Sequence, residues 1–499
     1  MSINVPDITL FIAPYTLISF PLIGVAYIES YLIKNNFSVD ILDLSNLVQT
    51  NNDKIKEFNM GDRRLWSTQE NAVKNFKILL NNTYFKSLLD IKSKVIGFSV
   101  FLSNKYLSIE IAKYIKNNDH EKIIVFGGPD CFITEWCRDI NNLSCGCIDL
   151  FVTGEGEEPL KQLLTKLKDK LKFDDIPDTI FVGTTFKINL KRDEDGNLDD
   201  LPFPVYKNFR KYKYTTQSLP LLFSRGCISK CIFCDVNRYW KKFRQRTPEN
   251  LFSEIKFHLM SNNVRQFFFC DSLINADITK LIEFCGLIIN NNIDIEMYGI
   301  GVAKDYMTLD VMKKLKKAGF TEFEFGIESG SQNVISNMKK LHKEKDIRFV
   351  LKNTFEAGIK CNIDLIAGFP MESEEDFLVT CDMLKNNAEY ISKVVGLDVC
   401  HIGKDRAVEY KLIDRFGLVY YNKENDNDWT DRIGNNIIIR YQRKIKLFRI
   451  IRKYGIKYVD VVYFNELTAR KAVLNKFQIL IEKCKDKFYE FFYKIIRNK

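Results

Sequence analysis

Two successive series of short apolar runs, each run followed by a helical pattern, constrain the fold of this chain more than any other feature. In the first series the runs are nearly continuous and rich in β-branched residues. Such runs indicate strands buried on both faces, as in a parallel sheet covered by helices. We therefore predict a doubly wound α/β domain over residues 1–190. Its expected strands are Ile8–Ile12, Val39–Leu42, Val95–Leu102, Ile123–Phe126 and Asp149–Val152, and its expected helices are Gly24–Asn35, Leu107–Lys116 and Glu157–Leu171.

A charged, turn-rich segment at residues 191–215 separates the two series and contains Pro202 and Pro204 close together. This composition is typical of a linker between domains. The second series has six strand–helix units, too few for a full eight-fold barrel, and predicts a partial (β/α)6 barrel over residues 216–405. A helical C-terminal region is expected over residues 406–499. The expected barrel strands are Leu221–Ser224, Gln266–Asp271, Ile295–Ile300, Glu322–Ile327, Asn362–Ala367 and Val394–Val399.

The composition excludes several classes of protein. With 46% apolar and 28% charged residues, the chain can bury ordinary cores and is not a disordered protein. Its 13 cysteines are too dilute for a disulfide scaffold. No basic stretch precedes the first apolar run, and Pro14 and Pro21 interrupt that run, so we expect neither a secretory signal nor a spanning helix. A cytoplasmic protein with reduced thiols is predicted.

The net charge of +10 is concentrated at the C-terminus. Residues 440–499 contain 17 basic and 5 acidic residues, so the remainder of the chain is nearly neutral. We favour a helical cap that buries an apolar face and keeps its lysines in solvent. The alternatives are a basic amphipathic surface that binds anionic lipid, which would make the protein peripheral to a membrane, and an acidic partner such as RNA. Nucleic acid is the least favoured of these partners.

The sharpest chemical signal is a cluster of three cysteines, Cys227, Cys231 and Cys234, at the spacing C-x3-C-x2-C. Three thiolates on a short loop can ligate three irons of a [4Fe–4S] cluster and leave the fourth iron open. A four-thiolate zinc site would need further ligands, and the nearest other cysteine, Cys270, stands alone. We therefore interpret the three cysteines as ligands of an iron–sulfur cluster.

This segment resembles the signature of the radical S-adenosylmethionine (SAM) superfamily, including the aromatic residue before the third cysteine. Segments 268–275, 325–331 and 367–372 resemble its SAM-binding motifs in the same order. The resemblance implies that the open iron binds SAM, and that one electron cleaves SAM to methionine and a 5′-deoxyadenosyl radical. It also implies an external electron donor similar to flavodoxin or ferredoxin. The implied SAM-binding residues are Phe233, Asp271, Ser272, Lys304, Gly326, Glu328, Ser329 and Pro370, with Lys304 standing where related sequences usually carry arginine.

Two glycine-rich turns follow expected strands in the first domain, at residues 127–129 (GGP) and 154–157 (GEGE). The chain has neither a G-x-G-x-x-G fingerprint nor a P-loop. Ahead of a radical SAM segment, these turns and the segment 21–27 resemble the Rossmann-like cobalamin-binding domain of cobalamin-dependent radical SAM proteins. The resemblance covers roughly residues 5–400. The cobalamin-binding residues that it implies are Leu22, Gly24, Ser99, Gly127, Gly128, Gly154, Glu155 and Gly156.

Two departures from cobalamin-binding sequences concern histidine. The D-x-H-x-x-G motif that ligates cobalt in methionine-synthase-like domains is absent, and His120 precedes an expected strand instead of following one. We interpret His120 as a surface residue, so any bound cobalamin would lack a protein imidazole below cobalt. The turn after GGP has Asp130 where many relatives carry histidine.

The resemblance implies methylation of an unactivated carbon in a small-molecule, lipid or peptide substrate: a substrate radical takes methyl from methylcobalamin, and a second SAM restores the cofactor. The alternatives are cyclisation or rearrangement without methyl transfer, a non-catalytic binding protein, and a methylthiotransferase. The last would need a second cluster from Cys131, Cys137, Cys145 and Cys147, for which we favour a packing role. The catalytic acid or base is unknown, and position alone suggests Tyr306, Cys361 and Cys400.

Overall fold

The computed structural model describes residues 5–15, 20–51, 68–191, 194, 196–206, 212, 214, 216–421 and 428–458. The chain divides into two compact units, and the division falls within the second series of strands. The first unit comprises Met1–Ile228, Asp235–Ile300 and Lys317–Gly319, and the second comprises Ser229–Cys234, Gly301–Lys316 and Phe320–Lys499. Each unit is described by itself below.

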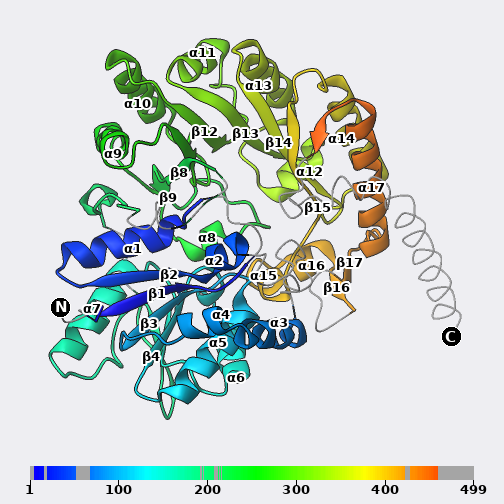
Figure 1. The fold of residues 1–499 in the computed structure, drawn as a ribbon. Helices are drawn as coiled ribbons and strands as arrows, with labels where there is room; N and C mark the ends of the chain where they lie inside the picture. Colours follow the sequence, from blue (N-terminus) through cyan, green and yellow to red (C-terminus); the bar gives the residue numbers. More distant parts are fainter. Residues whose placement is uncertain are drawn as a thin grey trace, which may run out of the picture. The chain divides into compact units, whose positions relative to one another are not determined.

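The first unit contains the doubly wound sheet (Figure 1). Its strand order is β2-β1-β3-β4-β5-β6-β7. The first five strands are parallel, whereas β6 and β7 are added as an antiparallel edge. This order places a topological switch point between β1 and β3, where ligands bind in such sheets. The strands are β1 (Ile8–Ile12), β2 (Val39–Asp43), β3 (Val95–Ser99), β4 (Ile123–Gly127), β5 (Leu150–Val152), β6 (Thr179–Val182) and β7 (Phe186–Ile188).

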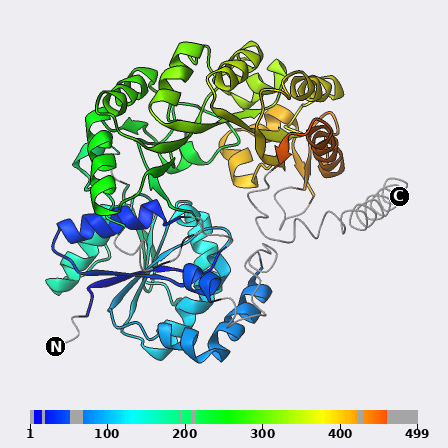
Figure 2. The same cartoon turned by 45° about the horizontal axis from the view of Figure 1, so that its top comes forward.

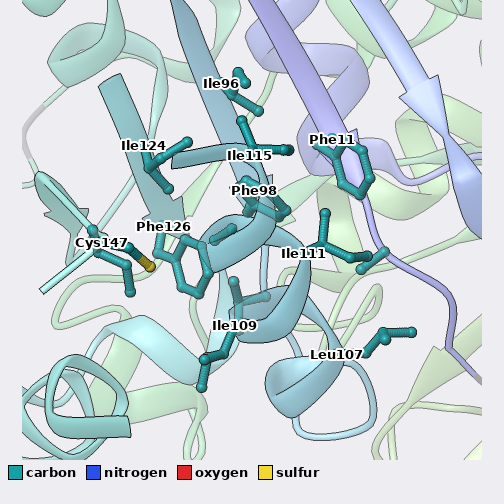
Figure 3. Close-up of a cluster of buried hydrophobic side chains, with 14 of the residues drawn as sticks. Phe11, Ile96, Phe98, Leu107, Ile109, Ile111, Ile115, Ile124, Phe126 and Cys147 are labelled. Carbon is teal, nitrogen blue, oxygen red and sulfur yellow. The ribbon is translucent and has the colours of Figure 1, made fainter. Parts of the chain in front are cut away.

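Helices cover both faces of this sheet (Figure 2). One apolar cluster joins alternate residues of the strands to α1 and α7, and another joins the opposite strand face to α2–α6. Figure 3 shows the second cluster, in which Phe11, Phe98 and Phe126 of three strands meet Ile111 of α5. The helices are α1 (Ile23–Lys34), α2 (Leu44–Thr50), α3 (Gln69–Asn81), α4 (Thr83–Leu88), α5 (Lys105–Asn118), α6 (Thr134–Ser144) and α7 (Glu157–Lys168).

The five strands and three helices predicted for this domain are confirmed, with ends shifted by a few residues. The edge hairpin of β6 and β7 was not predicted. Its strands have only four and three residues, and β7 is largely exposed, so no buried run marks it.

The first three strands of the second series also belong to the first unit. They are β8 (Ser218–Leu221), β11 (Gln266–Phe269) and β12 (Glu296–Gly301), which run parallel, with α9 (Pro248–Ser261) and α10 (Ile278–Asn290) between them. The predicted strand Leu221–Ser224 is wrong in its bounds, because the strand begins at Ser218 and includes Pro220. Proline is tolerated here because β8 is an edge strand. A short pair, β9 (Ser224–Arg225) with β10 (Arg244–Gln245), follows it.

The second unit contains the remaining three predicted strands in parallel order. They are β13 (Phe320–Glu328), β14 (Lys360–Ala367) and β15 (Lys393–Val399). The predicted α/β architecture with six strand–helix units is therefore confirmed. The helices of this unit are α11 (Leu309–Lys317), α12 (Gln332–Met338), α13 (Glu344–Glu356) and α14 (Glu374–Asn386).

The C-terminal region is helical, as predicted, with small strands added. It contains α15 (Lys404–Glu409), α16 (Leu412–Phe416), the hairpin β16 (Val419–Tyr420) and β17 (Trp429–Thr430), α17 (Ile437–Lys453) and β18 (Lys457–Tyr458). β18 pairs with β15 and extends its sheet. Residues 459–499, which make up most of the length of the basic tail, lie outside the described residues. None of the described helices is long and apolar enough to cross a bilayer.

Candidate functional site

A cavity of about 470 Å³ lies in the first unit at the carboxyl ends of β1, β3, β4 and β5. Apolar side chains such as Leu10, Val125 and Leu160 line much of it. Its position at the switch point is where a doubly wound sheet binds ligands. All eight residues predicted to bind cobalamin line this cavity: Leu22, Gly24, Ser99, Gly127, Gly128, Gly154, Glu155 and Gly156.

Glycine in the GGP turn is required by the backbone. Gly128 has φ of +107°, a conformation that side chains disfavour, and a Cβ atom there would lie 2.8 Å from the carbonyl oxygen of Val100. The turn therefore brings main chain against the cavity where any other residue would be strained. The neighbouring Asp130 is buried beside Lys105, 3.3 Å away, and does not line the cavity.

A buried ion-pair network joins the GEGE turn to the segment before the cysteines. Arg225 contacts Glu155 at 2.9 Å and Glu157 at 2.5 Å, and its side chain is only 6% exposed. Arg244 forms a second pair with Glu155. Burial tends to raise the pKa of Glu155, but Arg225 and Arg244 outweigh it and hold that pKa at about 2. Arg225, two residues before Cys227, is thus tied by charge to the cavity wall.

Asp271 also holds the segment before the cysteines, through hydrogen bonds with Phe223 and Ser224. Its carboxylate accepts hydrogen bonds from the backbone amides of Phe223 (2.9 Å) and Ser224 (2.5 Å) and from the Ser224 hydroxyl (2.5 Å). Burial raises the pKa of Asp271 to about 6, although the Ser224 hydroxyl lowers it. Asp271 and Ser272, both predicted SAM ligands, follow β11, and Asp271 uses these oxygens to support the segment leading to Cys227.

The three motif cysteines lie on an irregular loop. Cys227 belongs to the first unit, whereas Cys231 and Cys234 belong to the second. Gly226 has φ of +86°, and a Cβ atom there would lie 2.5 Å from the carbonyl oxygen of Lys242, so the turn into the loop needs glycine. Cys227 and Cys231 are buried, and no cysteine in the described part of the chain forms a disulfide.

These thiols are the donor type that an iron–sulfur cluster requires. Among the described residues, no three His, Cys, Asp or Glu side chains are already gathered to hold a metal ion. The cluster assignment therefore rests on the motif and on its reduced, sheltered thiols.

In the second unit, several predicted SAM-binding residues surround a lysine that was not predicted. Lys340 pairs with Glu328 at 3.1 Å and lies 5.8 Å from the centre of the Phe233 ring. Gly326 leaves room for this pair, since a Cβ atom there would be 3.1 Å from the Lys340 ammonium. Lys304 instead donates to the carbonyl oxygen of Leu341 at 3.3 Å. A lysine in the basic run MKKLHK gives no sequence signal of burial.

Comparison with known proteins finds a family match for the second series of strands. Residues 221–384, which include the three cysteines and the Lys340 region, match the Radical SAM superfamily. This part of the chain is therefore similar to radical SAM proteins.

Several curated proteins are similar in sequence to part of this chain. The uncharacterized methyltransferase PH0819 of Pyrococcus horikoshii is 25% identical over 331 residues, 64% of this chain and 70% of the relative. An anaerobic magnesium-protoporphyrin IX monomethyl ester cyclase of Synechocystis is 26% identical over 301 residues, 57% of each protein. The methylthiotransferase MJ0865 of Methanocaldococcus jannaschii is 25% identical over 329 residues, 62% of this chain and 69% of that protein.

Two solved structures are similar in fold to much of this chain. OxsB, a cobalamin-dependent SAM radical enzyme solved with aqua-cobalamin and SAM, has a TM-score of 0.59 at 19% identity over 91% of this chain and 62% of its own. The methyltransferase TsrM of Kitasatospora setae has a TM-score of 0.58 at 14% identity over 78% of this chain and 72% of its own. This chain spans less than two thirds of OxsB and of the cyclase.

The predicted SAM-binding loop at Pro370 is held by residues that the sequence did not single out. Asn435 donates to the carbonyl oxygens of Gly368 (3.1 Å) and Phe369 (3.0 Å). Arg443, from α17, donates to the carbonyl oxygen and a carboxylate oxygen of Glu372, both at 2.9 Å. Arg443, one of the basic residues of α17, therefore supports this loop directly. Ser329, another predicted contact, is fully buried.

The surroundings of the remaining candidate residues do not indicate a catalytic role. Cys131, Cys137 and Cys147 pack in the apolar cluster of Figure 3, whereas Cys145 is exposed. His120 is exposed in the turn before β4. Burial raises the pKa of Tyr306 to about 12 and raises the thiol pKa values of Cys361 and Cys400 well above their usual range. None of these three groups is tuned for proton transfer near neutral pH.

Proposed function

We propose that the chain is a cobalamin-dependent radical SAM enzyme that methylates an unactivated carbon. The observation that carries this proposal is the apolar cavity of the first unit, lined by all eight residues implied by the cobalamin-binding resemblance. Arg225, which also lines the cavity, is ion-paired to Glu155 and Glu157 and lies two residues from Cys227. The site thus combines a large ligand cavity with the start of a cluster-binding loop.

The cavity fits cobalamin in its chemistry. Its glycines expose main chain that could hydrogen-bond the peripheral carboxamides of the corrin, and its apolar walls suit the flat face of the ring. None of the described residues that line the cavity is a histidine, so main-chain groups and apolar side chains would hold cobalamin there. When bound, the cluster and SAM supply the radical that removes a substrate hydrogen atom, and methylcobalamin supplies the methyl group.

The residues of this chain hold and shield these groups. Arg225 and Asp271 fix the segment that leads to Cys227 through buried ion pairs and hydrogen bonds. Leu22 and Phe98 line the cavity and exclude water from it. An external reduced protein similar to flavodoxin or ferredoxin would provide electrons. Small molecules, lipids and peptides remain the candidate substrates.

A second candidate is cyclisation or rearrangement with the same cofactors. It is supported by the relatives named as magnesium-protoporphyrin IX monomethyl ester cyclases. A methylthiotransferase draws support from the names of three relatives, but Cys131, Cys137 and Cys147 pack among apolar side chains. We therefore place the cyclase second.

Anaerobic purification and reconstitution of the full chain test the proposal. We expect iron and sulfide near four per chain, and a visible spectrum with both iron–sulfur and corrinoid bands. Under turnover with reductant, methylation should yield both S-adenosylhomocysteine and 5′-deoxyadenosine, measured by chromatography and mass spectrometry. Deoxyadenosine alone would favour cyclisation or rearrangement. Absence of the corrinoid bands would overturn the cavity assignment, and absence of iron would indicate a non-catalytic protein.

Filling the cavity should block cobalamin. Gly97 of β3 lines the cavity, and a Cβ atom there would have ordinary contacts, 3.4 Å from Leu10 and 3.6 Å from Ile8. We expect Gly97→Leu to weaken hydroxocobalamin binding by about tenfold to hundredfold, because overpacking costs about 1–3 kcal/mol. Binding is measured by absorbance on the apo-protein. Thr165→Leu, on the exposed face of α7, is the control. Unchanged binding in Gly97→Leu would remove cobalamin from this cavity.

A further inference from the structure

The turn that follows α12 contacts the loop carrying the second and third motif cysteines. α12 ends at Met338, and its capping residue Lys339 has φ of +58°, so the chain reverses before the buried side chain of Lys340. The backbone amide of Ile232 donates to the carbonyl oxygen of Met338 at 3.1 Å. The Cys231 thiol lies 3.9 Å from the carbonyl oxygen of Lys339. The two segments are therefore held together by main-chain and sulfur contacts.

Lys340 places a fixed positive charge at this junction. Its side chain is only 11% exposed, its ammonium group lies 5.8 Å from the centre of the Phe233 ring, and it pairs with Glu328 at 3.1 Å. Burial tends to lower the pKa of Lys340. The Glu328 carboxylate, 3.1 Å away, outweighs burial and raises that pKa above its usual value. The ammonium group therefore stays charged beside the ring of Phe233, the residue directly before Cys234.

The position of the Lys340 charge matters because nearby charges change the reduction potential of an iron–sulfur cluster. An iron–sulfur cluster gains one negative charge when it accepts an electron, and nearby charge and hydrogen bonds set its reduction potential. A buried positive charge acts strongly because the surrounding dielectric is low. Lys340 should therefore favour the reduced cluster, while Glu328 offsets part of that effect.

We propose that Lys340 is a positioning residue of the radical SAM site, which raises the reduction potential of the cluster and orients the Glu328 carboxylate toward SAM. The electron comes from a chemical or protein reductant, dithionite in the test, and resides on the cluster. The proposal rests on the part of the proposed function in which Cys231 and Cys234 ligate a cluster. It does not depend on cobalamin or on methyl transfer.

Opposite charge changes at the two partners provide the test. The full chain is reconstituted anaerobically, and the cluster potential is measured by redox titration followed by electron paramagnetic resonance. We expect Lys340→Met to shift the potential to more negative values and Glu328→Gln to shift it to more positive values. Lys340→Arg should remain near the wild-type potential. A purely structural role would not produce shifts of opposite sign.

A matched control removes the same charge from an exposed position. Lys339 precedes Lys340 directly and its side chain is exposed, so solvent screens its charge. Lys339→Met should shift the potential less than Lys340→Met. Equal shifts in the two variants, or shifts of the same sign in Lys340→Met and Glu328→Gln, would overturn the proposal. If Lys340→Met assembles no cluster, Lys340→Gln, which removes the charge but keeps a polar side chain, is titrated in its place with the same expected negative shift.

SAM binding gives a second measurement. Loss of the charge that holds Glu328 should weaken SAM affinity by about tenfold, in line with the loss of a hydrogen bond to a charged group. Affinity is measured by titrating SAM into the loaded protein and following the cluster signal. Unchanged affinity in Lys340→Met would overturn the orienting role. A wild-type protein that binds iron but no corrinoid would overturn the methyltransferase proposal while leaving this test valid.

Discussion

Replacing Cys231 with alanine is expected to abolish cluster assembly and, with it, cleavage of SAM. Two remaining thiolates cannot hold three irons of a site-differentiated [4Fe–4S] cluster. Cys231 is buried beside the Ser229 hydroxyl, 2.9 Å from its sulfur, so no solvent ligand replaces the thiolate readily. Iron and sulfide content should fall to background after reconstitution, and 5′-deoxyadenosine should fall below detection.

A second cysteine variant separates this effect from general sensitivity to thiol loss. Cys145 is exposed at the end of α6 and lies outside the motif. Cys145→Ala should retain full iron content and SAM cleavage. If Cys231→Ala assembled a normal cluster, or if Cys145→Ala lost as much iron, the assignment of the motif would be wrong.

Replacing Arg225 with methionine should produce the largest loss of stability. Arg225 and Glu157 are 6% and 9% exposed, and removal of the guanidinium leaves Glu155 and Glu157 without their shared cation. Breaking a buried ion pair in this way costs about 3–5 kcal/mol. The midpoint of urea unfolding of the full chain should fall accordingly. Adding Glu157→Gln to Arg225→Met should recover part of the loss, because one buried charge then disappears.

The control for this variant is an exposed pair. Lys92 and Asp90 are 2.6 Å apart, but their side chains are 64% and 73% exposed. Lys92→Met should leave the unfolding midpoint unchanged within error, because solvent screens the pair. Equal midpoints in Arg225→Met and Lys92→Met would show that the buried network does not stabilise the first unit.

Most of the fold could be predicted from the sequence because strands buried on both faces leave a strong local signal. Runs such as Ile123–Phe126 and Val394–Val399 contain almost no polar residues and therefore could be located within a few residues. Pro220 misled the prediction of β8, since proline weakens a strand signal unless the strand is known to be an edge. Only the sheet order identifies that edge.

The cavity residues were predicted from a family resemblance, which rested in part on glycine-rich turns at the ends of strands. Gly127 and Gly154 mark the carboxyl ends of β4 and β5, and parallel strands bring those ends to one edge of the sheet. Charged partners could not be predicted in the same way. Arg225 and Glu157 are 68 residues apart, and Lys340 is one lysine in a basic run.

The sequence by itself determined the two parallel α/β series, the three cysteine ligands of a predicted cluster, and the turns that line the cavity. Each of these depends on local residue types at fixed spacing. Only the tertiary structure decided which charged residues are buried, and so assigned Arg225, Lys340 and Arg443 to the support of these segments. The physical reason is that burial of a long cationic side chain depends on a distant partner, which no local pattern records.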